Sequence, residues 1–358
     1  MWRWLLLVCV WTGCGDARVG GDGSVPPSDG GTASDGSMPA SDGGGRDAGQ
    51  TMPTSPLVDP DCVDGQYTET LPDPSIPIAD LSASFTTAQA VTFMDGALGR
   101  RYPFGQTLAR EGQEGFIDCV ATFLRDRSSP DAVIGEVATV VHECGHVYDD
   151  TLSSGQSNTY AIRAGLLLTG ARGDSTDRGG LTFARSRIRN DDYQSRRAPC
   201  PPGGFIGCDS YANIYLDGDP DDGTFDSGDQ GFNLLFDEVV QYVNSLATAY
   251  AFSGELSRTG FSVSERDGIL NFLWYMERYL RMARLDFPSA YQHLVTGDGG
   301  NWRRAILTVW GRAWLYLDVT EGMSALGIDD DALMTLVTDA DLLAEIQLLR
   351  DAEGCPAP

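Results

Sequence analysis

Lysine is absent from this sequence, since all 25 basic residues are arginine. Its absence excludes mechanisms that need a lysine amine, such as those of P-loop nucleotide hydrolases, Schiff-base enzymes and protein kinases. Basic charge is also scarce, because 51 acidic side chains give the 358 residues a formal net charge of −26 at pH 7. We therefore expect no nucleic-acid partner, because phosphate binding needs clustered positive charge.

The first residues carry the pattern of an export signal. Arg3 precedes an apolar run over residues 4–11 that is too short to cross a bilayer as a helix. Gly13 then precedes Cys14, and this resembles the lipobox of bacterial lipoproteins. The resemblance implies a signal peptide over residues 1–13 and a lipid on Cys14 that holds the protein at a membrane of the cell envelope. Secretion without a lipid is the alternative.

The next segment, residues 14–61, is rich in Gly, Pro, Ser, Thr and Asp and has no aromatic residue. Such a composition buries too little apolar surface to offset the entropy lost on ordering. We therefore expect a disordered tether, followed by one folded domain over residues 62–358.

Six cysteines lie beyond the signal, and an even number fits disulfides in an oxidising compartment. Two of them bracket a short Pro-Gly loop, and two lie at the ends of the predicted domain. The expected pairs are Cys200 with Cys208, Cys62 with Cys355 and, by what remains, Cys119 with Cys144.

Helical signals dominate the predicted domain. Ser129-Pro130-Asp131 favours a helix start, and Ser262 with Glu265 forms a capping-box pattern ahead of a helix that ends near residue 285. Further helices are expected over residues 130–150, 232–251, 302–317, 330–337 and 339–351. Strands are expected over residues 182–189 and 211–216. The fold class is therefore α+β and α-rich, with a small sheet and a C-terminal helical part.

The string His142-Glu143-Cys144-Gly145-His146 is an H-E-x-x-H motif. Histidines four residues apart lie about 40° from each other around an α-helix, so both imidazoles can face one metal ion. Glu143 lies beside that face and can hold a metal-bound water. Opposite the histidines lie the residues expected to pack into the core, namely Val133, Val137, Val140, Cys144 and Val147. The alternative is an ordinary amphipathic helix with two exposed histidines.

A zinc site of this kind needs a third protein ligand. Glu238 is the leading candidate, because it interrupts an otherwise apolar helical stretch where a charge requires a partner. The alternative is a glutamate that reaches solvent or pairs with an arginine. His293 is the second candidate ligand.

With these residues the sequence resembles the gluzincin branch of zinc metallopeptidases, which carry H-E-x-x-H on one helix and a glutamate ligand on a later one. The form H-E-x-G-H followed by Asp149 and Asp150 is similar to lethal-factor-type peptidases. The resemblance implies a zincin-like catalytic domain that hydrolyses peptide bonds. It also implies Zn²⁺ held by His142, His146 and Glu238, with the bound water activated by Glu143 as general base.

Other residues are candidates for supporting roles. Asp149 can orient a ligating imidazole or can be a solvated acid. Hydrogen-bond donors for an oxyanion can come from Tyr242, His293, Tyr211 or Tyr215.

Two charged runs have open interpretations. Asp217, Asp219 and Asp221 have the oxygen density that Ca²⁺ prefers, although the run does not fit an EF-hand. Three alternating arginines can bind an acidic substrate or pair with the domain's own aspartates, namely Arg185, Arg187 and Arg189.

The sequence therefore predicts an exported zinc metallopeptidase that acts on a protein or peptide. A non-enzymatic lipoprotein with structural metal sites, and a zinc amidase for a non-protein substrate, are the alternatives.

Overall fold

The computed structural model describes residues 49–115, 117–173, 183–201, 207–216, 231–260 and 262–356. The predicted signal peptide and the expected lipid site, Cys14, lie outside these residues. So do the candidate calcium ligands Asp217, Asp219 and Asp221. Within the described part the fold is helix-rich with one small sheet, as the predicted α+β class requires.

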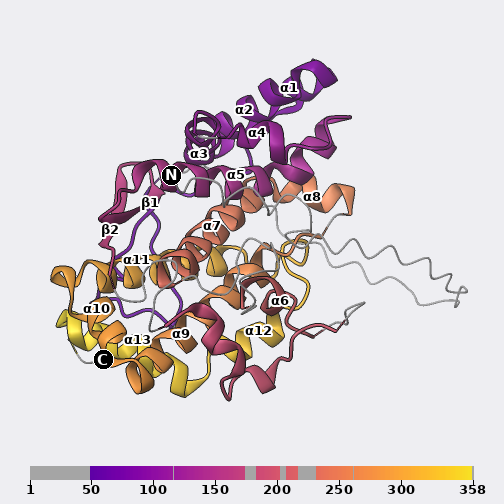
Figure 1. Cartoon of the computed structure of the whole chain (residues 1–358). Coiled ribbons are helices and arrows are strands. Elements are labelled where there is room, and N and C mark those ends of the chain that lie inside the picture. Colours follow the sequence, from indigo (N-terminus) through magenta and orange to yellow (C-terminus); the bar gives the residue numbers. More distant parts are fainter. Residues whose placement is uncertain are drawn as a thin grey trace, which may run out of the picture.

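Helix α7 lies at the centre of the molecule, with α1–α5 on one side of it and α9–α13 on the other (Figure 1). The helices before the sheet are α1 (Ala79–Ala83), α2 (Ala90–Arg101), α3 (Pro103–Gln113), α4 (Cys119–Phe123) and α5 (Pro130–Leu152). Those after it are α6 (Ala212–Tyr215), α7 (Phe232–Ala251), α8 (Ser253–Thr259), α9 (Glu265–Asp286), α10 (Pro288–Val295), α11 (Asn301–Val319), α12 (Asp330–Val337) and α13 (Ala340–Glu353). Short 3₁₀ helices are η1 (Thr87–Gln89), η2 (Arg185–Asn190), η3 (Gln194–Arg196) and η4 (Asp298–Gly300).

Helix α5 begins as its sequence predicts. The Ser129 hydroxyl accepts a hydrogen bond from the Ala132 amide at 3.1 Å, and Pro130 occupies the first turn, where its missing N–H is not needed. The valines expected opposite the histidines are all buried, so this face packs into the core. The predicted helix is therefore confirmed and extends two residues further.

The start of α9 differs from the capping box expected at Ser262. The residue before the helix is Ser264, and its side chain makes no capping hydrogen bond. Instead, the carbonyl of Leu326 accepts the Arg266 amide at 3.0 Å. A distant part of the chain thus satisfies a helix terminus that the local sequence was expected to cap.

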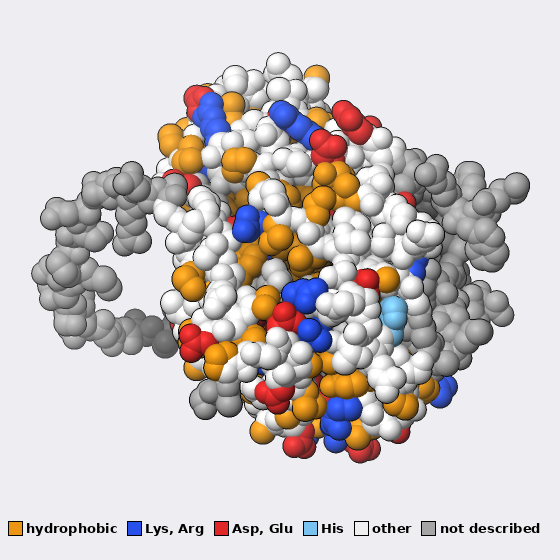
Figure 2. Space-filling view, turned by 90° about the vertical axis from the view of Figure 1, so that its left-hand side faces the viewer, with side chains coloured by type: hydrophobic (Ala, Val, Ile, Leu, Met, Phe, Trp, Pro, Cys, Tyr) orange, Lys and Arg blue, Asp and Glu red, His pale blue; other side chains and the backbone are white. Residues whose placement is uncertain are grey.

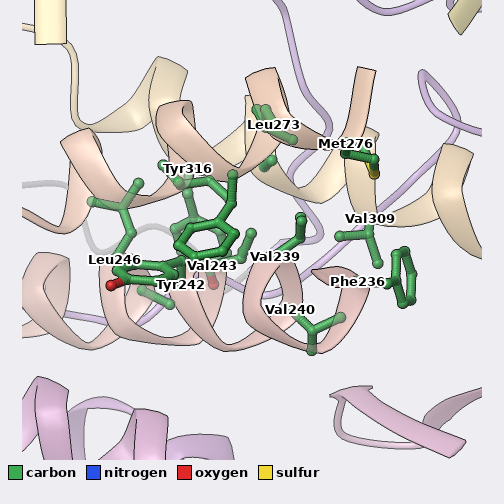
Figure 3. Close-up of a cluster of buried hydrophobic side chains, with 14 of the residues drawn as sticks. Phe236, Val239, Val240, Tyr242, Val243, Leu246, Leu273, Met276, Val309 and Tyr316 are labelled. Atoms are coloured by element: carbon green, nitrogen blue, oxygen red, sulfur yellow. The ribbon is translucent and has the colours of Figure 1, made fainter. Parts of the chain in front are cut away.

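In Figure 3 the side chains of Val239 and Val243 of α7 lie toward α9 and α11, whereas Val240 lies on the other side of the helix. In this cluster Phe236, Val239 and Val243 are completely shielded from solvent, as are Leu273 and Met276 of α9. Removal of this surface from water is the main source of stability in a helix-packed core. It fixes α7 as the rigid centre on which the site is built.

The sheet consists of β1 (Ser157–Arg163) and β2 (Leu166–Ala171), which pair antiparallel with Asn158 opposite Gly170. Gly165 forms the turn with a φ of +75°, a backbone conformation that glycine adopts without strain. The sequence did not predict this hairpin, because the middle of β1 is buried on both faces and so lacks the alternation of a half-exposed strand.

Both predicted strands are wrong. The part of residues 182–189 that the structure describes leads into η2, where the buried residues Arg185 and Ile188 are three apart, the repeat of a 3₁₀ helix. Residues 211–216 contain α6, because the carboxylate of Asp209 accepts the Tyr211 and Ala212 amides at 3.2 and 3.0 Å and fixes a turn.

The three arginines near η2 therefore do not share a strand face. Their contacts are Arg185 with the ring of Tyr215, Arg187 with the ring of Phe287 and Arg189 with the side-chain oxygen of Asn213.

All three predicted disulfides are present: Cys62–Cys355, Cys119–Cys144 and Cys200–Cys208. The first joins the two ends of the folded part, and the second ties α4 to α5. Disulfides persist in oxidising compartments, so this set fits an exported protein.

The folded part begins earlier than expected. Thr51 pairs with Glu69 through two backbone hydrogen bonds of 2.9 and 3.1 Å. The amides of Thr54 and Ser55 both donate to the carboxylate of Asp318 at 2.8 Å. These residues belong to the folded unit, and the boundary predicted at residue 62 is too late.

Charged side chains of both signs lie on the face of the molecule that Figure 2 shows. Figure 2 shows one face, on which arginines and acidic residues lie among apolar side chains. Two ion pairs near the surface join Arg100 to Asp80 at 2.6 Å and Arg110 to Asp95 at 2.5 Å. Among the described helices, none is both long and apolar enough to cross a membrane.

Candidate metal centre

Three buried side chains meet between α5 and α7. The Nε2 atoms of His142 and His146 lie 3.1 Å apart. Oε2 of Glu238 lies 3.4 Å from Nε2 of His142 and 3.6 Å from Nε2 of His146. Among the described residues this is the group whose ligand atoms converge closely enough to hold a metal ion. The structure therefore joins the three residues that the sequence proposed as ligands, and it excludes two exposed histidines.

The spacing of these atoms fits a small tetrahedral cation. Nitrogen and oxygen ligands about 2.0–2.1 Å from zinc lie about 3.3–3.4 Å from one another at tetrahedral angles. The observed separations of 3.1, 3.4 and 3.6 Å bracket that value. In addition, Oε2 of Glu238 is buried and makes no hydrogen bond, a costly arrangement unless a cation completes it.

Close contact between the two helices brings the ligands together. A Cβ atom on residue 145 would collide with Oε1 of Gln241 as that side chain is placed here. The glycine within the H-E-x-G-H string therefore leaves room for Gln241 between α5 and α7. On the other side of α5, Cys144 is bonded to Cys119 and cannot act as a ligand or nucleophile.

Each histidine is oriented through its second ring nitrogen. Nδ1 of His142 lies 3.0 Å from the Ser245 hydroxyl, and Nδ1 of His146 lies 2.9 Å from a carboxylate oxygen of Asp237. A proton on Nδ1 directed at Asp237 leaves the lone pair of Nε2 for the metal. Both partners come from α7, the helix that also carries Glu238.

Asp149 does not take the role considered for it. It is buried, so it is not a solvated acid, and its carboxylate accepts the Ala161 amide and the Gln241 side-chain amide, each at 2.8 Å. Burial and the neighbouring Asp237 raise its pKa well above the ordinary value. The carboxylate that contacts Nδ1 of His146 is instead that of Asp237, because α7 faces this side of the ring.

The site favours positive charge. Burial alone lowers the pKa of His146, but the carboxylates of Asp237 and Glu238 outweigh this and raise it well above the ordinary value. Burial conversely raises the pKa of Glu238, and the two imidazoles more than reverse that shift. The two carboxylates therefore favour a proton on His146, and the same negative charge would favour a divalent metal ion between the three side chains.

Three of the candidate catalytic residues lie on the same side of the structure as the ligands or contact a residue that does: Glu143, Tyr242 and Tyr211. Glu143 is buried beside the two ligands on α5. The ring of Tyr242 meets that of His142 edge-on with centroids 4.7 Å apart, and it stacks on Phe272 at 4.9 Å. Tyr211 lies against the other edge of Tyr242, with centroids 5.7 Å apart. An aromatic group thus adjoins one of the metal ligands.

His293 and Tyr215 are placed elsewhere by their contacts. His293 lies in α10, and its Nε2 is 3.0 Å from the carbonyl oxygen of Ala171 in β2. The ring of Tyr215 packs against Phe272 at 4.8 Å and lies under the guanidinium of Arg185. Neither belongs to the converging ligand group.

Three polar residues of α7 near the ligands were not expected from the sequence, namely Asp237, Gln241 and Ser245. Together with Asn244 they recur every three or four residues and form a polar stripe on an otherwise apolar helix. That periodicity was the available signal. Comparisons with protein-family models, with curated proteins and with solved structures found no match for this chain.

Proposed function

We propose that this protein is a zinc-dependent hydrolase that cleaves peptide bonds. The observation that carries the proposal is the convergence of His142, His146 and Glu238 at separations that suit tetrahedral zinc. Within the described residues the group has three members, and three protein ligands with one open position are typical of catalytic rather than structural zinc.

Zinc bound there would act as a Lewis acid and lower the pKa of water. The side chains of this chain supply the rest. Glu143, next to His142 on α5, accepts a proton from the attacking water and gives it to the leaving nitrogen as the C–N bond breaks. Tyr242, beside His142, is the nearest described candidate to donate a hydrogen bond to the carbonyl oxygen. Asp237 and Ser245 keep the imidazoles oriented.

The test compares the purified wild-type protein with Glu143→Gln, which keeps the size of the side chain but removes the base. We expect one zinc ion per chain in both, casein cleavage by the wild type, and a loss of about 10²- to 10⁴-fold in the variant. Zinc in both with cleavage by neither would favour a metal-stabilised binding protein. Cleavage of a non-protein amide alone would favour an amidase, and a wild type without zinc would refute the site.

We also propose that a lipid on Cys14 holds the domain at a membrane of the cell envelope. The disulfides support export, and the N-terminal pattern of the sequence supports the lipid. The same preparation tests this, because lipidated full-length protein partitions into detergent, and protein found entirely in the aqueous phase would refute the anchor.

A further inference from the structure

A chain of buried polar side chains connects the metal centre to an arginine on α11. It starts at His146 and passes through Asp237, Gln241 and Asn244 to Arg312. The successive distances are 2.9 Å from His146 Nδ1 to Asp237 Oδ2, 3.3 Å from Gln241 Nε2 to Asp237 Oδ1, 2.8 Å from Asn244 Nδ2 to Gln241 Oε1, and 2.7 Å from Arg312 Nη1 to Asn244 Oδ1. Gln241 and Asn244 have no exposed surface, and Arg312 is 1% exposed. Water therefore does not replace these partners.

Arginine gives this chain a single direction. A guanidinium only donates hydrogen bonds, so Asn244 must present its oxygen to Arg312 and its NH₂ group to Gln241. Gln241 must then present its oxygen to Asn244. Reversal of either amide would place two donors or two acceptors against each other in a dry environment, which is costly.

The orientation of the Gln241 amide determines which hydrogen bonds Asp237 can accept beside His146. The NH₂ group of Gln241 donates one hydrogen bond to Asp237 and the other to Asp149. Asp237 therefore stays an acceptor for the Nδ1 proton of His146, which leaves Nε2 to face the metal. A reversed Gln241 would instead turn its carbonyl oxygen toward the carboxylate of Asp237, so that two acceptors would face each other.

We propose that Arg312 is a positioning residue, which acts through Asn244 and Gln241 to hold Asp237 and thereby orient His146 toward the metal. The inference deepens the proposed function and rests on the metal centre described there. It assigns a role to a residue on α11, three side chains away from any ligand.

Arg312, at the end of this series of side chains, is held by residues from the N-terminal part of the protein. Glu69 accepts from Arg312 at 2.8 and 3.2 Å and from the Tyr67 hydroxyl at 2.7 Å, and Arg312 also donates to Tyr102 at 3.1 Å. The buried charge of Arg312 is thus compensated, and its guanidinium is held at several points. Only its Nη1 group is directed at Asn244.

The diagnostic variant is Asn244→Asp. The new carboxylate accepts from Arg312 as before, but it has no NH₂ group to donate to Gln241, so the Gln241 amide must reverse. We expect the zinc Kd, measured by competition with a chromophoric chelator, to rise about 10- to 100-fold. The visible absorption of the cobalt-loaded protein should change as well. The added charge pair with Arg312 offsets part of the cost of the reversed amide, so thermal stability should fall less than in Arg312→Met.

A second pair of variants separates positioning from general damage. Arg312→Met should weaken zinc binding about as much as Asn244→Asp does. The control is Arg266→Met. Arg266 is 5% exposed and donates hydrogen bonds to Asp330, the Leu317 carbonyl and Thr320. None of these three residues belongs to the hydrogen-bonded series from His146 to Arg312. It should lower stability and leave the zinc Kd unchanged.

The outcomes distinguish this inference from the proposed function. A wild-type protein that binds no zinc would overturn both. Wild-type zinc binding with an unchanged Kd and cobalt spectrum in Asn244→Asp would overturn the positioning role alone, even if Arg312→Met fails to fold. Equal losses of zinc affinity in the Arg266→Met control and in Asn244→Asp would also overturn it.

Discussion

Both faces of α7 are buried, but one packs into the apolar core and the other orients the residues of the site. The face toward α9 and α11 is mainly apolar, with side chains such as Val239, Val243 and Leu246 (Figure 3), and Asn244 is the residue there that contacts Arg312 of α11. The face toward α5 carries Glu238 and a stripe of polar side chains with specific partners. Apolar packing is non-directional and mainly supplies stability, whereas every buried polar group demands one geometry. A single helix can therefore stabilise the fold through one face and orient the site through the other.

Substitutions on the two faces should therefore have opposite profiles. Leu246→Ala removes completely buried apolar surface and should cost about 2–5 kcal/mol of unfolding free energy, with the zinc Kd unchanged. Ser245→Ala removes the partner of His142 Nδ1 and should cost no more than about 1 kcal/mol while raising the zinc Kd about tenfold. Urea unfolding and chelator competition on both variants measure the two quantities. Equal effects of the two substitutions on the zinc Kd would contradict the separate roles of the two faces of α7.

A buried carboxylate outside the site shows what the imidazoles contribute. Burial raises the pKa of Asp267 to about 6, although it accepts the Ile328 and Asp329 amides at 3.0 Å. Its folded pKa exceeds the unfolded value, so its contribution to stability is complete below about pH 4 and is lost as the pH rises through about 6. Glu238, also buried, is shifted the other way by two histidines.

Asp267→Asn should remove this dependence, because the amide does not ionise. We expect the wild type to lose about 2–3 kcal/mol relative to the variant between pH 4 and pH 7. Urea unfolding of both proteins at the two pH values measures the difference. Parallel pH profiles would show that Asp267 is not held neutral by burial.

Two glycines of α5 sharpen the comparison at the closest approach of the polar face. Gly145→Ala collides with Gln241 and should cost about 1–3 kcal/mol and weaken zinc binding, since Gln241 contacts Asp237. The matched control is Gly135→Ala on the same helix, where a Cβ would meet nothing within 4 Å. It should stabilise the protein by about 0.5–1 kcal/mol through helix propensity alone. Identical stabilities for the two variants would contradict the close packing of α5 on α7.

Elements with strong local signals were predictable. Ser129 and Pro130 mark the start of α5 through interactions within one turn, and the helix predicted over residues 232–251 has the bounds of α7. Two disulfides were also predictable, because Cys200 and Cys208 bracket a short loop and Cys62 and Cys355 lie at the ends of the predicted domain, and the third pair was what remained. The hairpin of β1 and β2 was not, because burial of β1 on both faces depends on neighbours distant in the sequence.

The site was predictable in part for the same reason. His142 and His146 lie on one helix, so their four-residue spacing already places both rings on one face. Glu238 was expected from its isolation among apolar residues, although its distance from the histidines depends on how α5 packs on α7. Asp237 was not expected to contact His146, because nothing local to either residue indicates which helix the imidazole will face.

The amino-acid sequence by itself indicated the longer helices, two of the cysteine pairs and two of the ligands, since these follow from interactions between near neighbours or from residue chemistry. Tertiary structure alone decided how close Glu238 comes to the histidines, that Asp237 meets His146, that residue 145 packs against Gln241, and that an arginine on α11 faces Asn244. These depend on the distance and angle between helices, which apolar packing across the whole core sets and no short stretch of sequence contains.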